Sequence, residues 1–173
     1  MKFLKLLCVA ALSVLVGCGV SEESPSTEVT TSQPSGSSYV ADAEPADAVP
    51  VGTARESVED DEAVTLVGTI GGSSEPFVDG LAAFTIVDPK VPYCAPDEGC
   101  PTPWDYCCTQ DQVKTNIATV KIVDESGKPV ADDARTLLGV KELSTVVVQG
   151  KAQRDDKGNL TIAATKVFVR AGE

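Results

Sequence analysis

The stretch Asp132-Asp133-Ala134-Arg135-Thr136-Leu137-Leu138-Gly139 decides the fold of this 173-residue chain. Its acidic residues can cap the start of a helix, and its glycine can adopt the left-handed conformation that ends one. The stretch therefore predicts a single short helix. On both sides of it apolar and polar residues alternate as they do in β-strands, so the helix stands alone among strands.

Five segments show this alternation, three before the helix and two after it. Their apolar positions are Val64, Leu66, Gly68 and Ile70; Phe84 and Ile86; Ala118, Val120 and Ile122; Val146, Val148 and Gly150; and Leu160, Ile162 and Ala164. In the last segment the apolar parity then shifts to Val167 and Val169, which predicts a β-bulge near Ala164. The turn signal Asp155-Asp156-Lys157-Gly158-Asn159 predicts that the last two strands form a hairpin.

This order of elements resembles the OB-fold, a small and partly open five-stranded barrel. The resemblance rests on element order, covers residues 63–170 and carries no specific motif. We therefore predict an all-β domain over residues 62–173, with a five-stranded sandwich of another topology as the alternative. The resemblance implies ligand binding across the second and third strands, whose outward residues would be Thr85, Val87, Thr119, Lys121 and Val123.

The N-terminus has the features of an export signal. Lys2 and Lys5 precede and interrupt an apolar run that closes with Leu15-Val16-Gly17-Cys18. This pattern resembles the lipobox signal of bacterial lipoproteins. The resemblance covers the first eighteen residues and implies that residues 1–17 are a signal peptide and that Cys18 carries a lipid. A transmembrane anchor is the alternative, but the apolar run is shorter than the roughly 20 residues that a bilayer requires.

The predicted address is the cell envelope, lipid-anchored and facing the periplasm or the exterior. Gly19 rather than Asp follows Cys18, which slightly favours the outer membrane. Residues 18–61 are predicted to be a disordered acidic linker, because large apolar residues are scarce and acidic residues outnumber the single basic residue, Arg55. Tyr39 and Val40 are the one hint of a docking point in it.

A long connection, residues 89–117, joins the second and third strands and contains Cys94, Cys100, Cys107 and Cys108. Such length is uncommon in a compact domain. In an exported protein, four cysteines in one loop are typical of disulfide staples. Adjacent Cα atoms lie about 3.8 Å apart, below the roughly 4.4 Å that a disulfide needs. We therefore expect Cys94 and Cys100 each to pair with one member of the doublet.

Two other uses of these cysteines remain open. Thiolates select zinc or Cu(I), but the spacing departs from the two to four residues usual between paired zinc ligands, so no metal or other cofactor is predicted. A strained Cys107–Cys108 disulfide would be easily reduced and could act as a redox switch.

The same loop contains the aromatic residues Tyr93, Trp104 and Tyr106. They are candidates for partner binding, since aromatic side chains anchor interfaces. The favoured interpretation is that they form a small core inside the loop, because large aromatic side chains are more often buried. The run from Cys100 to Cys108 resembles runs in secreted or lipid-anchored proteins of planctomycete bacteria, a resemblance that implies no activity.

Composition argues against several classes of function. The chain has no histidine, so Ser-His-Asp and Cys-His nucleophile pairs cannot form within it. Its net charge of −12 opposes nucleic-acid binding, and the second and third strands offer one lysine and no stacking aromatic residue. The paired carboxylates fall in the linker, a turn and a helix start, where solvent would keep them ordinary acids.

The sequence therefore predicts a lipid-anchored, extracytoplasmic and non-enzymatic binding or interaction module of the cell envelope. Its partners would be the membrane, through the lipid on Cys18, and an envelope protein or a glycan, but not nucleic acid. The alternative is a cysteine-based protein that binds zinc or copper or performs thiol redox chemistry. A weaker alternative is a glycan-binding OB-like barrel.

Overall fold

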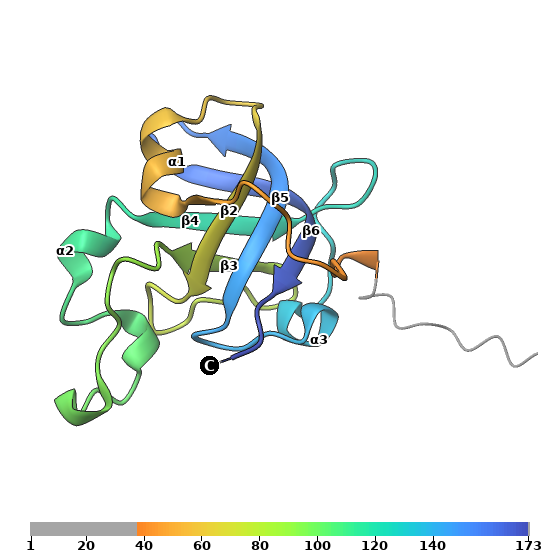
Figure 1. The fold of residues 1–173 in the computed structure, drawn as a ribbon. Helices are drawn as coiled ribbons and strands as arrows, with labels where there is room; N and C mark the ends of the chain where they lie inside the picture. Colours follow the sequence, from red (N-terminus) through yellow and green to blue (C-terminus); the bar gives the residue numbers. More distant parts are fainter. Residues whose placement is uncertain (1–37, 173) are drawn as a thin grey trace, which may run out of the picture. The chain divides into compact units, whose positions relative to one another are not determined.

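The computed structural model describes residues 38–172, and Figure 1 shows their arrangement. The predicted signal peptide, residues 1–17, and Cys18 lie outside the described residues. The elements in chain order are β1 (Val49–Pro50), α1 (Val51–Ser57), β2 (Ala63–Ile70), β3 (Ala83–Val87), α2 (Gln110–Val113), β4 (Ile117–Ile122), α3 (Ala134–Leu138), β5 (Thr145–Arg154) and β6 (Leu160–Val169). Two 3₁₀ turns, Pro96–Glu98 and Pro103–Asp105, lie between β3 and α2.

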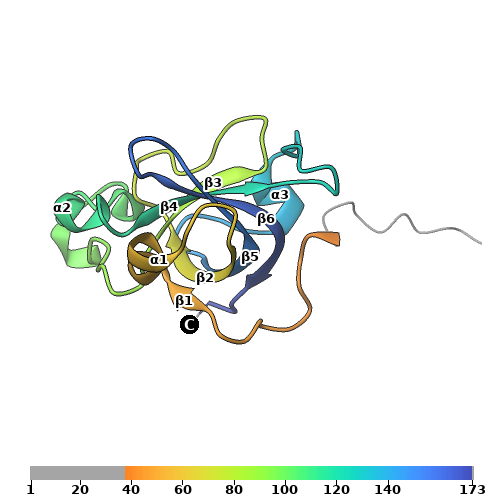
Figure 2. The same ribbon diagram turned by 90° about the horizontal axis from the view of Figure 1, so that it is seen from above.

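Strands β2 to β6 form a closed barrel, which Figure 2 shows encircling a common axis. The order is β2-β3-β4-β6-β5, and β5 closes the ring by pairing with β2. Only the β4–β6 pair is parallel among these five strands. With α3 between β4 and β5, the predicted OB-like barrel of five strands and one intervening helix is confirmed.

The interior of the barrel is filled by the apolar residues that were predicted, from their alternation with polar residues, to lie on one face of each strand. The fully buried side chains include Leu66, Ile70, Phe84, Ile86, Val120, Ile122, Val146, Val148 and Ile162. Each strand contributes to this single cluster. Burying aliphatic side chains is worth about 1.5–3 kcal/mol each, so the core supplies the main driving force for closing the ring.

The predicted bulge and hairpin are both present. Gln149 pairs with Lys166 while Gly150 pairs with Ala164, so Thr165 is the extra residue of the bulge. Only glycine fits at position 150, because the Cβ of any other residue would overlap the carbonyl oxygen of Ala163. In the turn between β5 and β6, the Asp155 carboxylate accepts backbone hydrogen bonds, including one from Asn159 at 2.8 Å.

Helices α1 and α3 cover opposite ends of the barrel in Figure 1. In α3, Asp133 caps the first turn by accepting a hydrogen bond from the Thr136 N–H at 3.0 Å, and Gly139 ends the helix with a φ of 69°. Leu137 and Leu138 are buried against the core, as are Val51 and Ala54 from α1. The predicted short helix is therefore confirmed, but it does not stand alone, because α1 and α2 are further helices of residues 38–172.

The structure differs here from the disordered linker predicted over residues 18–61. Its described part, residues 38–61, contains β1, α1 and a strap over β6. The strap begins with Tyr39 and Ala41, whose backbones exchange hydrogen bonds of 2.8 and 2.9 Å with Val167. A few apolar side chains inserted into the core are enough to order a segment that is otherwise polar and acidic.

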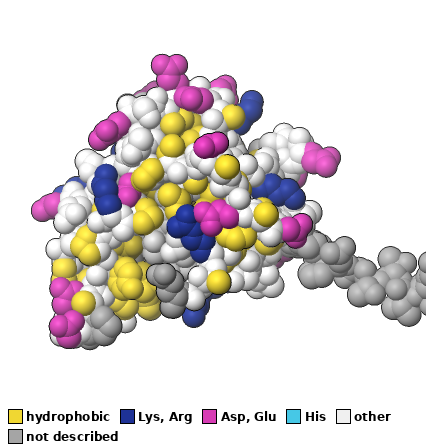
Figure 3. Space-filling view, in the orientation of Figure 1, with side chains coloured by type: hydrophobic (Ala, Val, Ile, Leu, Met, Phe, Trp, Pro, Cys, Tyr) yellow, Lys and Arg dark blue, Asp and Glu magenta, His cyan; other side chains and the backbone are white. Residues whose placement is uncertain are grey.

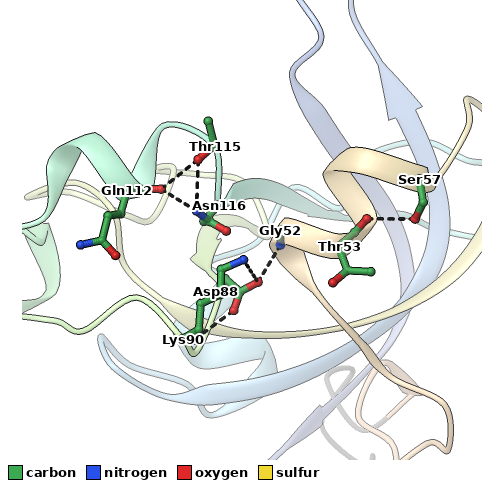
Figure 4. Close-up of polar contacts among 8 residues, drawn as sticks. All are labelled: Gly52, Thr53, Ser57, Asp88, Lys90, Gln112, Thr115 and Asn116. Atoms are coloured by element: carbon green, nitrogen blue, oxygen red, sulfur yellow. Dashed lines mark hydrogen bonds and ion pairs between the residues drawn. The ribbon is translucent and has the colours of Figure 1, made fainter.

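Polar contacts hold both ends of α1 to the barrel. Asp88, at the end of β3, accepts a 2.7 Å hydrogen bond from the Gly52 N–H in the first turn (Figure 4). The approach is close, because a Cβ on Gly52 would collide with Asn116 and Lys90. At the other end, the Arg154 guanidinium donates hydrogen bonds to carbonyl oxygens of α1 and of Val58 just after it.

No helix in residues 38–172 is long and apolar enough to cross a membrane.

Candidate metal centre

The cysteine loop leaves the barrel after β3 and returns at β4, and it packs against the β2–β3 connection. The Gly72 N–H donates to the Trp104 carbonyl at 2.8 Å, and the Trp104 indole N–H donates to the Ser74 carbonyl at 3.0 Å. Tyr106 packs with apolar residues of the loop base in a second, small core: Val87, Val91 and Val113. The loop is thus attached to the barrel by contacts that involve no sulfur atom.

Two tight turns bring the cysteines together. Between Cys94 and Cys100, the Glu98 carboxylate accepts the Ala95 N–H at 2.6 Å, and Gly99 adopts a φ of 70°. Between Cys100 and Cys107, the Asp105 carboxylate accepts the Cys107 N–H at 2.8 Å, and Tyr106 adopts a left-handed φ of 58°. Each turn reverses the chain, so cysteines with five or six residues between them arrive at one point.

The sulfur atoms of Cys94, Cys100, Cys107 and Cys108 all lie within 4.8 Å of one another. The shortest separations join Cys107 to Cys100, at 3.0 Å, and to Cys94, at 3.2 Å. Cys107 and Cys108 are 3.7 Å apart, and Cys94 and Cys108 are 3.9 Å apart. All four thiols are free, and a disulfide would require about 2.05 Å. The predicted disulfides therefore stay a prediction.

These separations bracket the geometry of a four-thiolate metal site. A zinc–sulfur bond of about 2.3 Å in a tetrahedron places neighbouring sulfur atoms about 3.8 Å apart. The four cysteines could therefore hold one metal ion. The spacing of the cysteines in the sequence argued against this arrangement. In the structure the two turns span the intervals between the cysteines, and the adjacent Cys107 and Cys108 would supply two of the four ligands.

The four thiols have unequal environments. Cys94 is only 2% exposed, whereas Cys107 and Cys108 are exposed. A hydrogen bond from the backbone N–H of Cys108 is the main reason that the pKa of Cys94 is lowered. Contacts with Cys100, Cys94 and Cys108 raise the pKa of the Cys107 thiol. The four sulfur atoms lie so close together that all four can be deprotonated at once only if a cation is bound to them.

The lysines of the loop, Lys90 and Lys114, lie near its two ends and pair with Asp88 and Asp111. From Val91 to Val113 the sequence contains no lysine or arginine, but it contains Asp97, Glu98, Asp105 and Asp111. A divalent metal ion would therefore be the compensating positive charge at this cluster.

The three aromatic residues of the loop do not act as one surface. Tyr106 is 1% exposed, and its burial raises the pKa of its hydroxyl to about 12. Tyr93 packs edge-on against it with ring centroids 6.5 Å apart, yet remains 49% exposed. Tyr106 is therefore unavailable as a partner-binding residue, which corrects its assignment as a candidate. Trp104 is half-buried, and Tyr93 is the exposed member of the set.

The ligand face expected from the OB-like resemblance is partly covered. Val87 and Val123 are buried, while Thr85, Thr119 and Lys121 remain accessible. Arg55 from α1 reaches this side of the barrel and donates a 2.9 Å hydrogen bond to the Ile117 carbonyl. A hollow of about 240 Å³ remains beside it.

A larger hollow, of about 730 Å³, lies on the outside of β2, β5 and β6, and its rim includes Asp61 and Glu125. Acidic side chains are spread over the face in Figure 3, and lysine and arginine form no large patch on it.

Comparisons with known proteins assign the chain to no family. No protein family matches the chain, and no curated protein matches it. Among solved structures, it is similar to the hypothetical protein ygiW from E. coli, with 16% sequence identity and a TM-score of 0.38. The match covers 76% of this chain and 96% of that one, and nothing about function follows from it.

Proposed function

We propose that this protein is a lipid-anchored envelope domain whose cysteine loop binds one zinc ion through Cys94, Cys100, Cys107 and Cys108. The observation that carries the metal site is the convergence of the four sulfur atoms within 4.8 Å of one another. Four sulfur ligands in tetrahedral array are typical of zinc or iron–sulfur sites. Two of the contacting separations, 3.7 and 3.9 Å, are near the roughly 3.8 Å of a tetrahedral zinc site, and the two at 3.0 and 3.2 Å would widen on binding one ion.

The proposed site is structural rather than catalytic. Four protein ligands would complete the tetrahedron, whereas catalytic zinc keeps one position open for water or substrate. The ion would lock two reversals of the loop and so fix the exposed Tyr93 beside the barrel. This supports a non-enzymatic binding module that presents a rigid loop to an envelope partner, and the lipobox resemblance at Cys18 supports the address.

The test is a metal count on the full chain. The protein is purified under a phosphine reductant without chelators, and bound metals are measured by inorganic mass spectrometry for the wild type, Cys94→Ser and Asp97→Asn. We expect about one zinc per chain in the wild type and in Asp97→Asn, which changes a loop carboxylate but no sulfur. Cys94→Ser removes a ligand and should lose most of the metal, because thiolate ligation supplies the affinity.

Substitution with Co²⁺ gives an independent readout, since thiolate ligation in a tetrahedral site produces intense visible and near-ultraviolet absorption. A wild-type chain that neither retains zinc nor takes up Zn²⁺ or Co²⁺ when reduced would contradict the proposal. If the chain binds iron or copper instead of zinc, the four-cysteine metal site is supported and zinc is the wrong metal.

A further inference from the structure

We infer that this centre has two mutually exclusive states: a thiolate state that holds zinc, and an oxidised state with Cys94–Cys108 and Cys100–Cys107 disulfides that releases it. The inference rests on the proposed zinc function and adds its regulation. The four sulfur atoms that would bind the metal are the same four that would form the bonds, so one set of atoms cannot do both.

The sulfur contacts select this pairing from three possibilities. Cys107–Cys108 with Cys94–Cys100 requires a bond between adjacent residues, whose Cα atoms are about 3.8 Å apart and too close for a relaxed disulfide. Cys94–Cys107 leaves Cys100 for Cys108, whose sulfur atoms lie within 4.8 Å of each other but are not among the contacting pairs at 3.0 to 3.9 Å. The remaining pairing joins the closest two sulfur atoms, at 3.0 Å, and a second pair at 3.9 Å.

The exposed doublet gives an oxidant access. Cys107 and Cys108 are both exposed, and each belongs to a different pair in the proposed arrangement. Cys107 also contacts the three other sulfur atoms. A soluble disulfide can therefore reach one member of each pair without opening the barrel.

The exchange balances with a low-molecular-weight disulfide, RSSR, as oxidant. The Cys107 thiolate attacks RSSR, which forms a mixed disulfide and releases one RS⁻. The Cys100 thiolate, 3.0 Å away, then attacks the Cys107 sulfur and releases the second RS⁻. The same two steps at Cys108 and Cys94 consume a second RSSR. In total, one zinc ion bound by four thiolates and two RSSR give two protein disulfides, four RS⁻ and free Zn²⁺.

The barrel should survive the change. The loop base is held by the Trp104 indole on Ser74, by backbone contacts of Gly72 and by the burial of Tyr106. None of these contacts uses a sulfur atom, so the two states differ within the loop alone.

The experiment titrates zinc-loaded full chain with oxidised glutathione. Released zinc is followed with a metallochromic indicator, disulfides are located by peptide mapping without reduction, and circular dichroism reports the barrel. We expect about one zinc released per two glutathione disulfides consumed, the Cys94–Cys108 and Cys100–Cys107 peptides, an unchanged barrel spectrum and renewed zinc uptake after phosphine reduction. Cys100→Ser should still form Cys94–Cys108 but leave Cys107 without its partner.

The outcomes separate the two proposals. Zinc that binds to the reduced chain and stays bound in excess glutathione disulfide overturns the inference alone. A Cys107–Cys108 peptide, or Cys94–Cys107 with Cys100–Cys108, overturns the pairing. Failure of the reduced chain to bind zinc at all overturns the proposed function and the two-state inference with it.

Discussion

Asp88 shows how one buried charge can join two distant segments. Among residues 38–172 it is the only charged residue in the buried class, at 1% exposure. Its carboxylate accepts the Gly52 N–H at 2.7 Å and the Lys90 N–H at 3.0 Å. Because a charged acceptor strengthens such bonds, Asp88 fastens α1 to the end of β3.

Replacing Asp88 with alanine should therefore lower the free energy of unfolding by about 1–3 kcal/mol, since the Gly52 N–H would lose its partner while the site stays closed to water. Urea denaturation of both proteins measures the difference. Asp111→Ala is the matched control, because its carboxylate is 97% exposed and pairs only with Lys114 on the surface. The control should change stability by less than about 0.5 kcal/mol. Equal losses in both variants would show that Asp88 has no special role.

At the same scale, the sequence indicated which residues form the candidate site but not how they combine. Four cysteines in one loop predicted mutual proximity. Spacing rules then disfavoured a metal, because they assume ligands on one short knuckle. The structure brings the cysteines together with the help of a left-handed Tyr106, a conformation that non-glycine residues seldom adopt. A tyrosine in the sequence gives no sign that its backbone will adopt this conformation.

At the scale of elements, strands were predictable and α1 was not. Every barrel strand carries enough alternating apolar residues to show its period, and Gly139 marks the end of α3. In α1 only Val51 and Ala54 reach the core, and Gly52 interrupts the helical pattern. Two apolar residues in an acidic segment are too few to show a helical repeat. The helix therefore depends on tertiary contacts, which cannot be read from the local sequence.

The clearest of those contacts is Arg154, which closes the C-terminal end of α1 from strand β5. Its guanidinium donates to the carbonyl oxygens of Ala54, Arg55 and Val58 at 2.7 to 3.1 Å. These oxygens belong to the last turn of the helix or just follow it, where positive charge is favourable, and the Ala54 oxygen also accepts the Val58 N–H at 2.9 Å. Arg154 therefore donates hydrogen bonds to carbonyl oxygens at the end of α1, and its positive charge also interacts favourably with the helix dipole.

Arg154→Ala should destabilise the protein by about 1.5–3 kcal/mol, the range for hydrogen bonds to charged groups. Hydrogen exchange should accelerate selectively in residues 51–57. Lys151→Ala removes a cation from the same strand that makes no contact of this kind, and it should leave both readouts nearly unchanged. Fast exchange of residues 51–57 already in the wild type would contradict the view that α1 is an integral cover of the barrel.

At the scale of the whole molecule, the question is what would attach the barrel domain to a membrane. The domain of residues 38–172 has one main core, into which α1 and α3 pack. The acidic composition of the chain gives it no electrostatic attraction to anionic lipid. Membrane attachment, if the lipobox resemblance holds, therefore depends on Cys18 and the lipid on its thiol.

Cys18→Ala should consequently move the protein from the membrane to the soluble fraction, because each buried CH₂ of a lipid chain contributes about 0.8 kcal/mol to anchoring and the variant would have none. Fractionation with a high-salt wash, followed by detergent phase partitioning, measures the change. Cys100→Ser is the matched control, since it removes a thiol from the loop and should leave the protein in the membrane. The variant must also keep the barrel spectrum, so that release reflects the missing lipid rather than misfolding. If Cys18→Ala stays in the membrane pellet after the salt wash, the anchor lies elsewhere and the lipoprotein proposal fails, while the proposal of a zinc centre is unaffected.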